Sequence, residues 1–330
     1  MRRKVKIAMM SVVSVALAFV VTACGTQAGT PSSSGKKPLI GFSEVTESSP
    51  YYVELKDAIL KQGAKSGFSV IFEDAHNSVS KENADVQDML TRGIKLLIID
   101  AANPQGVAPA IAAAKKANVP VIAVDRPISL PVTSFVGRDN QQMGHLVGEY
   151  AKQLIGGKGT IFEIQGAPGD LVMMARRKGF DSVFSGNANV KIVHSTYDYY
   201  ERDKAIVSAE DFLASPHPHL KLIYAHNDDM AMGALKVLQE HHITNVDVVG
   251  IDGLMSAIKA IKDGTQYKAT ALNDPAYQGT VAVKVAAKVL AGKTVPKFVN
   301  VGTTLVTFSN AAKYYNAKLG FASYRPPVKF

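Results

Sequence analysis

The sequence contains a single cysteine, Cys24, among its 330 residues. A chain with one cysteine cannot form an internal disulfide, and the Cys-x-x-Cys pairs of zinc and redox sites are excluded as well. If the chain is exported, the thiol is either exposed and reactive or chemically modified. The residues around Cys24, discussed below, favour modification.

The sequence motifs of several enzyme classes are also missing. No GxxxxGK[ST], GxSxG or HExxH is present, and "GGKGT" at 156–160 lacks the spacing of a phosphate loop. The histidines His217, His219, His241 and His242 have no third metal ligand at a useful spacing. The sequence therefore predicts no enzyme, no cofactor and no metal site.

No hydrophobic run is long enough for a membrane anchor. The uncharged run at 7–23 is slightly shorter than the roughly 20 apolar residues that a transmembrane helix needs, and polar Ser11 and Ser14 interrupt it. Basic residues at positions 2, 3, 4 and 6 precede this run, and small residues end it. That order is typical of an export signal, so we predict a signal peptide at 1–23.

The last residues of this signal, "VTAC" at 21–24, resemble a bacterial lipobox. The resemblance implies that Cys24 becomes the lipidated first residue of the mature chain. Residues 24–37 are rich in Gly, Ser, Thr and Pro, which is typical of a flexible tether. We therefore expect an extracytoplasmic protein whose folded body begins near Pro38 and is held at the cell membrane by a lipid.

The positive charge of the chain does not point to nucleic acid. Removal of 1–23 takes away four basic residues and no acidic ones, so the formal charge falls from +9 to +5. The remaining lysines and arginines are scattered along predicted helices, as on a solvated surface. With export, this pattern predicts no nucleic-acid partner.

From Leu39 onward, short apolar runs alternate with longer amphipathic stretches. The runs lack polar alternation, as parallel strands covered on both faces do; they are 39–44, 68–75, 94–100, 119–126, 159–166, 190–195, 220–228 and 246–253. The stretches between them have apolar residues at three- and four-residue spacing; examples are 53–65, 81–92, 104–117, 142–155 and 230–241. This pattern predicts an α/β protein built from βα units.

Eight to ten such units are too many for one open sheet of usual size, and they fall into two comparable sets. We therefore predict two doubly wound parallel-sheet lobes. A (β/α)8 barrel has a similar strand count and is the alternative architecture. The absence of catalytic-looking clusters at the strand ends disfavours the barrel.

Polar residues follow nearly every predicted strand. Parallel sheets bind ligands at the carboxyl ends of their strands, and carboxylate, amide and guanidinium groups suit a ligand with several hydroxyl groups. Each residue alone has a simpler explanation, because Asp and Asn often form turns and helix N-caps. The residues are Asp74, Asp100, Asp125, Arg126, Gln165, Asn227, Asp228, Asp229, Asp252, Asn273 and Asp274.

Two pairs of tyrosines follow strands in different halves of the chain. Tyr51 and Tyr52 come after the first strand, and Tyr199 and Tyr200 come after a strand of the second half. The C–H faces of a sugar ring lie flat on aromatic rings, so one pair from each half could hold a sugar between them. Ordinary core packing is the alternative for both pairs.

Several segments together resemble the periplasmic binding protein type I family, specifically the ribose-binding-like sugar receptors of ABC importers. The resemblance covers about 39–306 and rests on "SSPYYVELKDA", the segment at 82–126, "IQGAPG", "ARRKGF", "YAHNDDMAMGAL" and "VVGIDG". It implies two α/β lobes joined by a hinge of three crossovers, with the ligand between them. The implied N-terminal lobe is 38–139 with 274–303, and the C-terminal lobe is 140–273 with 304–330.

The resemblance also implies which residues contact the ligand. The first lobe would contribute Ser49, Tyr51, Tyr52, Asp125 and Arg126, and the second lobe Arg176, Tyr200, Asn227, Asp252 and Asn273. The sequence departs from the ribose-binding pattern at Val45, Ser49, Tyr51, Tyr52, Tyr200 and Asn273. These departures leave a pentose, a hexose and a polyol open as ligands.

The expected partners follow from the family. They are a monosaccharide or polyol, the permease of an ABC transporter and the membrane to which the lipid attaches, and the chain is expected to act as a monomer. Transcriptional regulators with the same core need an N-terminal DNA-binding module, and here a signal and a tether occupy that place. A chemosensory or furanosyl-signal receptor that uses the same cleft remains an alternative. The tail after Val306 extends past the family core and has no predicted function.

Overall fold

The computed structural model describes residues 37–217 and 219–330. The predicted signal peptide, the tether up to residue 36 and Cys24 lie outside these residues. Within the described part of the chain, no helix has the length and apolar character needed to cross a membrane.

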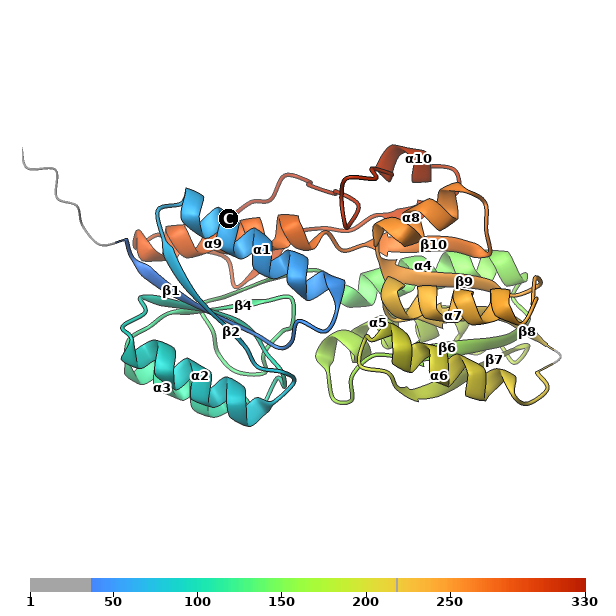
Figure 1. Ribbon diagram of the computed structural model, residues 1–330, viewed down its shortest axis with the longest axis horizontal. Helices are drawn as coiled ribbons and strands as arrows, with labels where there is room; N and C mark the ends of the chain where they lie inside the picture. The colour runs from blue at the N-terminus through green and yellow to red at the C-terminus, as the bar shows by residue number, and fades with distance from the viewer. Residues whose placement is uncertain (1–36, 218) are drawn as a thin grey trace, which may run out of the picture. The chain divides into compact units, whose positions relative to one another are not determined.

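Two six-stranded sheets form the framework (Figure 1). The first has the order β11-β5-β4-β3-β1-β2 and all its strands are parallel; they are β1 (Leu39–Glu44), β2 (Ser69–Asp74), β3 (Leu96–Asp100), β4 (Val121–Val124), β5 (Ser134–Gly137) and β11 (Phe298–Asn300). The second has the order β12-β10-β9-β8-β6-β7; its strands are β6 (Gly159–Gln165), β7 (Val190–Tyr197), β8 (Leu220–Ala225), β9 (Asp247–Asp252), β10 (Tyr267–Leu272) and β12 (Leu305–Thr307). Two open sheets confirm the predicted fold class and rule out the barrel.

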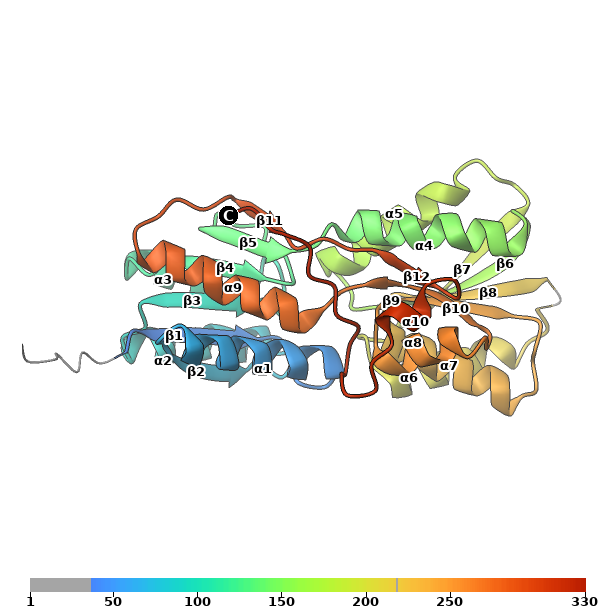
Figure 2. The same cartoon turned by 90° about the horizontal axis from the view of Figure 1, so that it is seen from above.

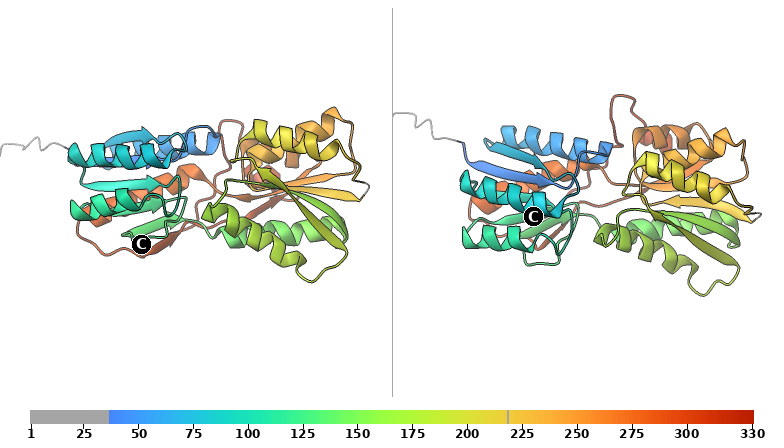
Figure 3. Two further views of the ribbon diagram at one scale, coloured as in Figure 1. Left: turned by 90° about the horizontal axis from the view of Figure 1, so that it is seen from below. Right: turned by 60° about the horizontal axis from the view of Figure 1, so that its bottom comes forward.

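Helices cover both faces of each sheet, so each sheet and its helices form one lobe. The first lobe has α1 (Pro50–Lys65) and α9 (Pro275–Leu290) side by side on one face, with α2 (Val79–Thr91) and α3 (Ala108–Lys116) on the other (Figures 1 and 3). The helices of the second lobe are α4 (Asn140–Ile155), α5 (Leu171–Phe184), α6 (Arg202–Leu213), α7 (Asp228–Glu240), α8 (Met255–Lys262) and α10 (Ala311–Tyr314).

The strands form where the sequence is continuously apolar, because both faces of a parallel sheet are buried. All five residues of β3, "LLIID", and all four of β4, "VIAV", are buried. Helix starts follow local capping chemistry: the side chain of Asp139 accepts a hydrogen bond from the backbone N–H of Gln142, and Asp274 accepts from that of Tyr277. Chemistry visible in the sequence thus fixes both kinds of element.

The chain passes between the lobes at three places in the body of the fold. It leaves the first sheet after β5, returns after β10 to form α9, and crosses again from β11 to β12. The last crossing adds the only antiparallel pair among the described strand pairs, because β12 runs against β10. The sequence pattern did not indicate that β12 runs antiparallel to β10.

The C-terminal tail differs from the expected assignment of 304–330 to the second lobe. β12 and α10 do belong to that lobe, and Phe321 forms a β-bridge with Leu254 there. The tail then runs back to the first lobe, where the Tyr277 hydroxyl of α9 donates a hydrogen bond to the carbonyl of Pro326 at 2.5 Å. Figure 2 shows this dark red segment running from α10 toward α9. Spacing alone could not show where a short irregular tail lies.

Helices α4 and α5 approach so closely that their backbones touch. A Cβ atom added at Gly144 would lie 2.0 Å from the carbonyl oxygen of Arg176, and one added at Gly179 would lie 2.0 Å from that of Gln141. Glycine is therefore required at both positions for steric reasons, since a Cβ cannot approach a carbonyl oxygen that closely.

We expect Gly179→Ala to destabilise the protein by more than about 2 kcal/mol, because overpacking against a rigid helix backbone costs about 1–3 kcal/mol or more. Chemical denaturation measures the change. The control is Gly156→Ala at the left-handed end of α4. An added Cβ there would meet no neighbouring side chain or backbone within 4 Å, so only the backbone penalty of about 1–2 kcal/mol applies. Equal losses in the two variants would contradict the steric explanation.

Candidate ligand-binding site

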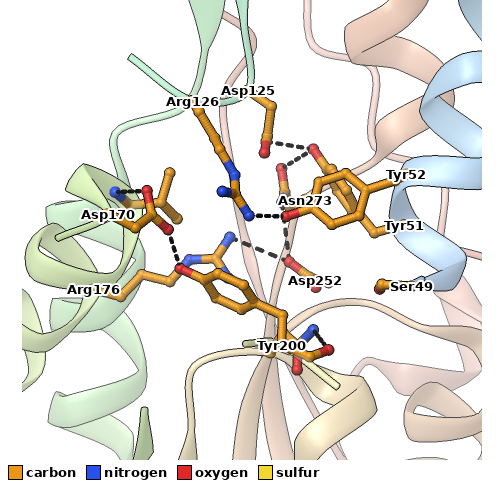
Figure 4. A pocket seen from close by; sticks show the side chains of 12 residues that line it. Ser49, Tyr51, Tyr52, Asp125, Arg126, Asp170, Arg176, Tyr200, Asp252 and Asn273 are labelled. Atoms are coloured by element: carbon orange, nitrogen blue, oxygen red, sulfur yellow. Dashed lines mark hydrogen bonds and ion pairs between the residues drawn. The ribbon is translucent and has the colours of Figure 1, made fainter. Parts of the chain in front are cut away.

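A cavity lies where residues of both lobes meet (Figure 4). Its lining is almost entirely polar and includes all ten residues named from the sequence; the lining residues are Ser49, Tyr51, Tyr52, Asp125, Arg126, Asp170, Val172, Arg176, Tyr200, Asn227, Asp252 and Asn273. The predicted residues are thus brought together in one place. Their contact with a ligand remains a proposal.

The secondary structure explains why these residues meet. Asp125 and Arg126 directly follow β4, Asp252 ends β9 and Asn273 follows β10. Three other lining residues are helix N-caps, which also lie at the carboxyl ends of strands; they are Ser49 of α1, Asp170 of α5 and Asn227 of α7. The carboxyl ends of parallel strands are where α/β sheets bind ligands.

Three lining residues have positive backbone φ angles that non-glycine residues rarely adopt. The values are 59° at Asp125, 64° at Tyr200 and 127° at Asp252. Such conformations cost about 1–3 kcal/mol each and concentrate at functional sites. Their occurrence at three positions around one cavity supports a binding role over a purely structural one.

In the first lobe, the tyrosines position the charged pair after β4. The Tyr51 hydroxyl donates to Asp125 Oδ1 at 2.7 Å, and Arg126 donates from Nη2 to the Tyr52 hydroxyl. Arg126 Nε also lies 3.9 Å from Oδ1 of the buried Asp100. The carboxylate and guanidinium at the end of β4 are therefore fixed before any ligand arrives.

In the second lobe, Arg176 is held from three directions. Its Nε donates to Asn140 Oδ1 at 2.9 Å, its Nη1 donates to the carbonyl of His226, and its Nη2 lies 3.3 Å from Asp252 Oδ1. Asn273 donates to the same Asp252 oxygen at 3.0 Å. Burial disfavours the charged carboxylate and raises the pKa of Asp252 to about 7. The positive charge of Arg176 acts in the opposite direction but does not cancel the effect of burial.

The aromatic rings of the two lobes meet at Arg126. The guanidinium carbon lies 5.4 Å from the ring centroid of Tyr52 and 5.6 Å from that of Tyr200, within the range of cation–π attraction. The Tyr200 hydroxyl donates to Asp170, which fixes the second ring. Tyr199, expected to share this role, is 41% exposed and lies under Lys204 instead.

The sequence did not identify Asp170 and Val172 as lining residues. Asp170 caps α5 by accepting a hydrogen bond from the backbone N–H of Val172 at 3.0 Å while its other oxygen faces Tyr200. Its place before a predicted helix start was a visible signal, but an N-cap alone does not reveal which way the second oxygen points. Arg138 was also missed: it lies behind Asn273 and donates to its Oδ1 at 2.6 Å.

Other polar residues at strand ends have structural roles. Asp228 accepts hydrogen bonds from the backbone N–H groups of Gly253 and Leu254 at 2.7 and 2.8 Å. The remaining ones outside the cavity lining are Asp74, Asp100, Gln165, Asp229 and Asp274. The simpler interpretation as turns, caps and supports therefore holds for about half of the strand ends.

Two buried carboxyl groups lie side by side at the ends of β1 and β3. Glu44 is paired in register with Asp100, both are completely buried, and neither has a hydrogen-bond partner for its carboxyl oxygens among the described residues. Burial, followed by repulsion from Asp100, raises the pKa of Glu44 from 4.5 to about 10. Glu44 is therefore protonated at neutral pH in the folded chain and ionised in the unfolded chain.

We expect Glu44→Gln to be more stable than the unmodified chain at pH 8, with a difference that shrinks toward pH 5. The folded-state pKa of Glu44 lies above the unfolded value, so the free energy of unfolding falls as pH rises between them, by up to about 1.4 kcal/mol per pH unit. Glutamine removes this slope. Denaturation at several pH values, with exposed Glu240→Gln as control, measures it; an unchanged slope would disprove the assignment.

Comparison with known proteins yields relatives along most of the chain. Residues 40–294 match a family model described as "Periplasmic binding protein domain". The ribose import binding protein RbsB of Bacillus subtilis is 31% identical over 295 residues, covering 88% of this chain and 95% of its own. A xylitol-binding protein of Mycolicibacterium smegmatis is 27% identical, covering 83% of this chain and 78% of its own.

A solved structure is more similar still. It is an ABC transporter solute binding protein from Mycobacterium smegmatis with bound glycerol, and it is 47% identical with a TM-score of 0.84. The match covers 87% of this chain and 100% of that one. The similarity therefore extends over both lobes.

Proposed function

The chain belongs to the periplasmic binding protein family, and from this premise we propose that it captures a monosaccharide or polyol outside the cytoplasm and delivers it to an ABC transporter permease. The observation that carries the proposal is the polar cavity, whose lining comes from both lobes. The ribose, xylitol and glycerol named for the relatives are all small polyhydroxylated molecules.

The chemistry of the cavity supports an uncharged ligand. Three carboxyl groups, of Asp125, Asp170 and Asp252, face two guanidinium groups, of Arg126 and Arg176, so the lining has no excess of positive charge for an acid or a phosphate. Hydroxyl groups both donate and accept hydrogen bonds, and can therefore pair with carboxylate and guanidinium alike. We propose that all ten residues predicted from the sequence contact such a ligand.

The proposed mechanism is hinge closure, the known behaviour of periplasmic binding proteins. The ligand first binds one lobe, and contacts with the other lobe then favour the closed state. Only contacts made in the closed state can shift the equilibrium toward it. The permease would recognise the closed form.

We also propose that one chain is the functional unit, because residues of a single chain complete the cavity. We propose lobe boundaries at 139/140, 273/274 and 303/304, with the end of the tail lying on the first lobe. A sensory role in the same cleft would differ only in the partner that contacts the closed form.

A thermal-shift screen of pentoses, hexoses and polyols, including ribose, xylitol and glycerol, tests the proposed function. A ligand present at 100 times its dissociation constant should stabilise the folded chain by about 2.7 kcal/mol. Citrate and sugar phosphates serve as charged controls and should have no effect. A folded protein that responds to none of the uncharged compounds would contradict the proposal.

With the ligand identified, we expect Arg126→Met and Asp252→Ala each to weaken its binding by about 2–5 kcal/mol, because each leaves a buried partner unpaired. Titration calorimetry measures the affinity. Arg92→Met and Asp263→Ala change the same residue types on the surface and should leave it unchanged. Unaltered affinity in both cavity variants would refute the assignment of the site.

We further propose that Cys24 carries a lipid that anchors the mature chain to the cell membrane. Support comes from the lipobox-like residues 21–24 before it. We expect Cys24→Ser to move the protein from the membrane fraction to the soluble fraction after cell lysis, with unchanged ligand affinity. Equal amounts of both proteins in the membrane fraction would contradict lipidation at this residue.

A further inference from the structure

Three potential metal ligands converge on the second lobe, away from the cavity lining. Glu163 lies on β6, His194 lies on β7 and Asp181 lies on α5, which covers the same face of the sheet. Glu163 and His194 are direct partners in the parallel pairing of β6 and β7, so their side chains emerge on one face. One ligand atom from each residue lies within 4.8 Å of the others.

Each of these three residues also has a buried atom without a hydrogen-bond partner among the described residues. Glu163 Oε2, Asp181 Oδ1 and His194 Nε2 are shielded from solvent, and none has a hydrogen-bond partner within the described part of the chain. Glu163 itself is completely buried. His194 Nε2 lies 3.1 Å from Glu163 Oε2, which is the distance of an ion pair, although the orientation of the ring does not suit a hydrogen bond. A buried carboxylate oxygen without a partner is costly, so its orientation toward two other such atoms requires an explanation.

The opposite oxygen of each carboxylate is held by a neighbouring donor. His226 Nδ1 accepts a hydrogen bond from the backbone N–H of Gly166 at 3.3 Å, so Nε2 of the neutral ring carries the proton and donates to Glu163 Oε1 at 2.7 Å. Arg177 Nε donates to Asp181 Oδ2 at 3.4 Å. Supporting hydrogen bonds that orient one carboxylate oxygen and leave the other free are typical of metal sites.

From this geometry we propose that Glu163, Asp181 and His194 bind one divalent transition-metal ion of the Zn²⁺ type. One imidazole nitrogen with two carboxylate oxygens suits zinc, whereas calcium and magnesium prefer oxygen ligands alone. Three protein ligands leave further coordination positions to water. The side chain of His194 is 29% exposed, which provides a route for the ion.

Sequence inspection missed this combination because the three residues are far apart along the chain and belong to three different elements. No short motif joins them, and His194 is not among the histidines weighed as metal ligands from the sequence, which are those at positions 217, 219, 241 and 242. The strand register and the helix crossing bring the ligands together. The ion would tie β6, β7 and α5 to one another.

The test is calorimetric titration of the metal-stripped full chain, purified without a histidine tag, with Zn²⁺. We expect one ion per chain, and at least about a tenfold loss of affinity in His194→Gln and in Asp181→Asn. His241→Gln is the matched control: this exposed histidine lies 2.7 Å from Glu210 but has no third ligand among the described residues, and its substitution should leave zinc affinity unchanged. Cys24 is common to all variants and cannot cause a difference between them.

Several outcomes would overturn the proposal. One is the absence of zinc binding, which would mean that His194 and Glu163 form an ion pair only. Another is zinc binding that persists unchanged in both ligand variants, which would place the ion elsewhere. A third is binding of Ca²⁺ or Mg²⁺ in the same titration with an affinity equal to that for Zn²⁺. Neither His194 nor Asp181 lines the cavity, so unchanged sugar affinity in His194→Gln and Asp181→Asn shows that these variants are folded.

Discussion

The site depends on the burial of two guanidinium groups, those of Arg126 and Arg176, in one cavity. A buried charge is tolerated only when other groups compensate it, and here each lobe surrounds its arginine with fixed acceptors. Arg126 has Tyr52 and Asp100, while Arg176 has Asn140, the carbonyl of His226 and Asp252. At the proposed site, a polyhydroxylated ligand would compete with these partners, and specificity would follow from how well its hydroxyl groups replace or complete them.

The lining residues with positive φ angles and the helix N-caps also help to position the cavity lining. Strand ends and helix starts alternate around the cavity, so short turns position most of its lining. Long side chains enter the cavity from α1 and α5 and from the turns that carry Arg126 and Tyr200. A pocket built in this way offers directional hydrogen bonds with little freedom to rearrange, which suits discrimination between small molecules that differ in the position of one hydroxyl group.

The sequence could predict the features that depend on local chemistry. Continuous apolar runs indicated the parallel strands, and the polar residues at the carboxyl ends of β4, β8 and β9 indicated the cavity, because strand ends converge in any doubly wound sheet. It could not predict features that depend on distant contacts. Asp170 and Asp228 are both acidic residues at helix starts, yet only the first lines the cavity. The contact of Arg126 with Tyr200, the reversal of β12 and the path of the tail likewise depend on segments far apart in the chain.

The glycine contact between α4 and α5 has a consequence for how ligand preference can evolve. Gly144 lies against the backbone of Arg176, and α4 begins directly after the first crossing between the lobes. Arg176, which is proposed to contact the ligand, therefore lies on the same closely packed helix pair that begins directly after the first crossing between the lobes. Substitutions that rotate this helix pair slightly would move Arg176 and change ligand selectivity, even at residues that do not contact the ligand.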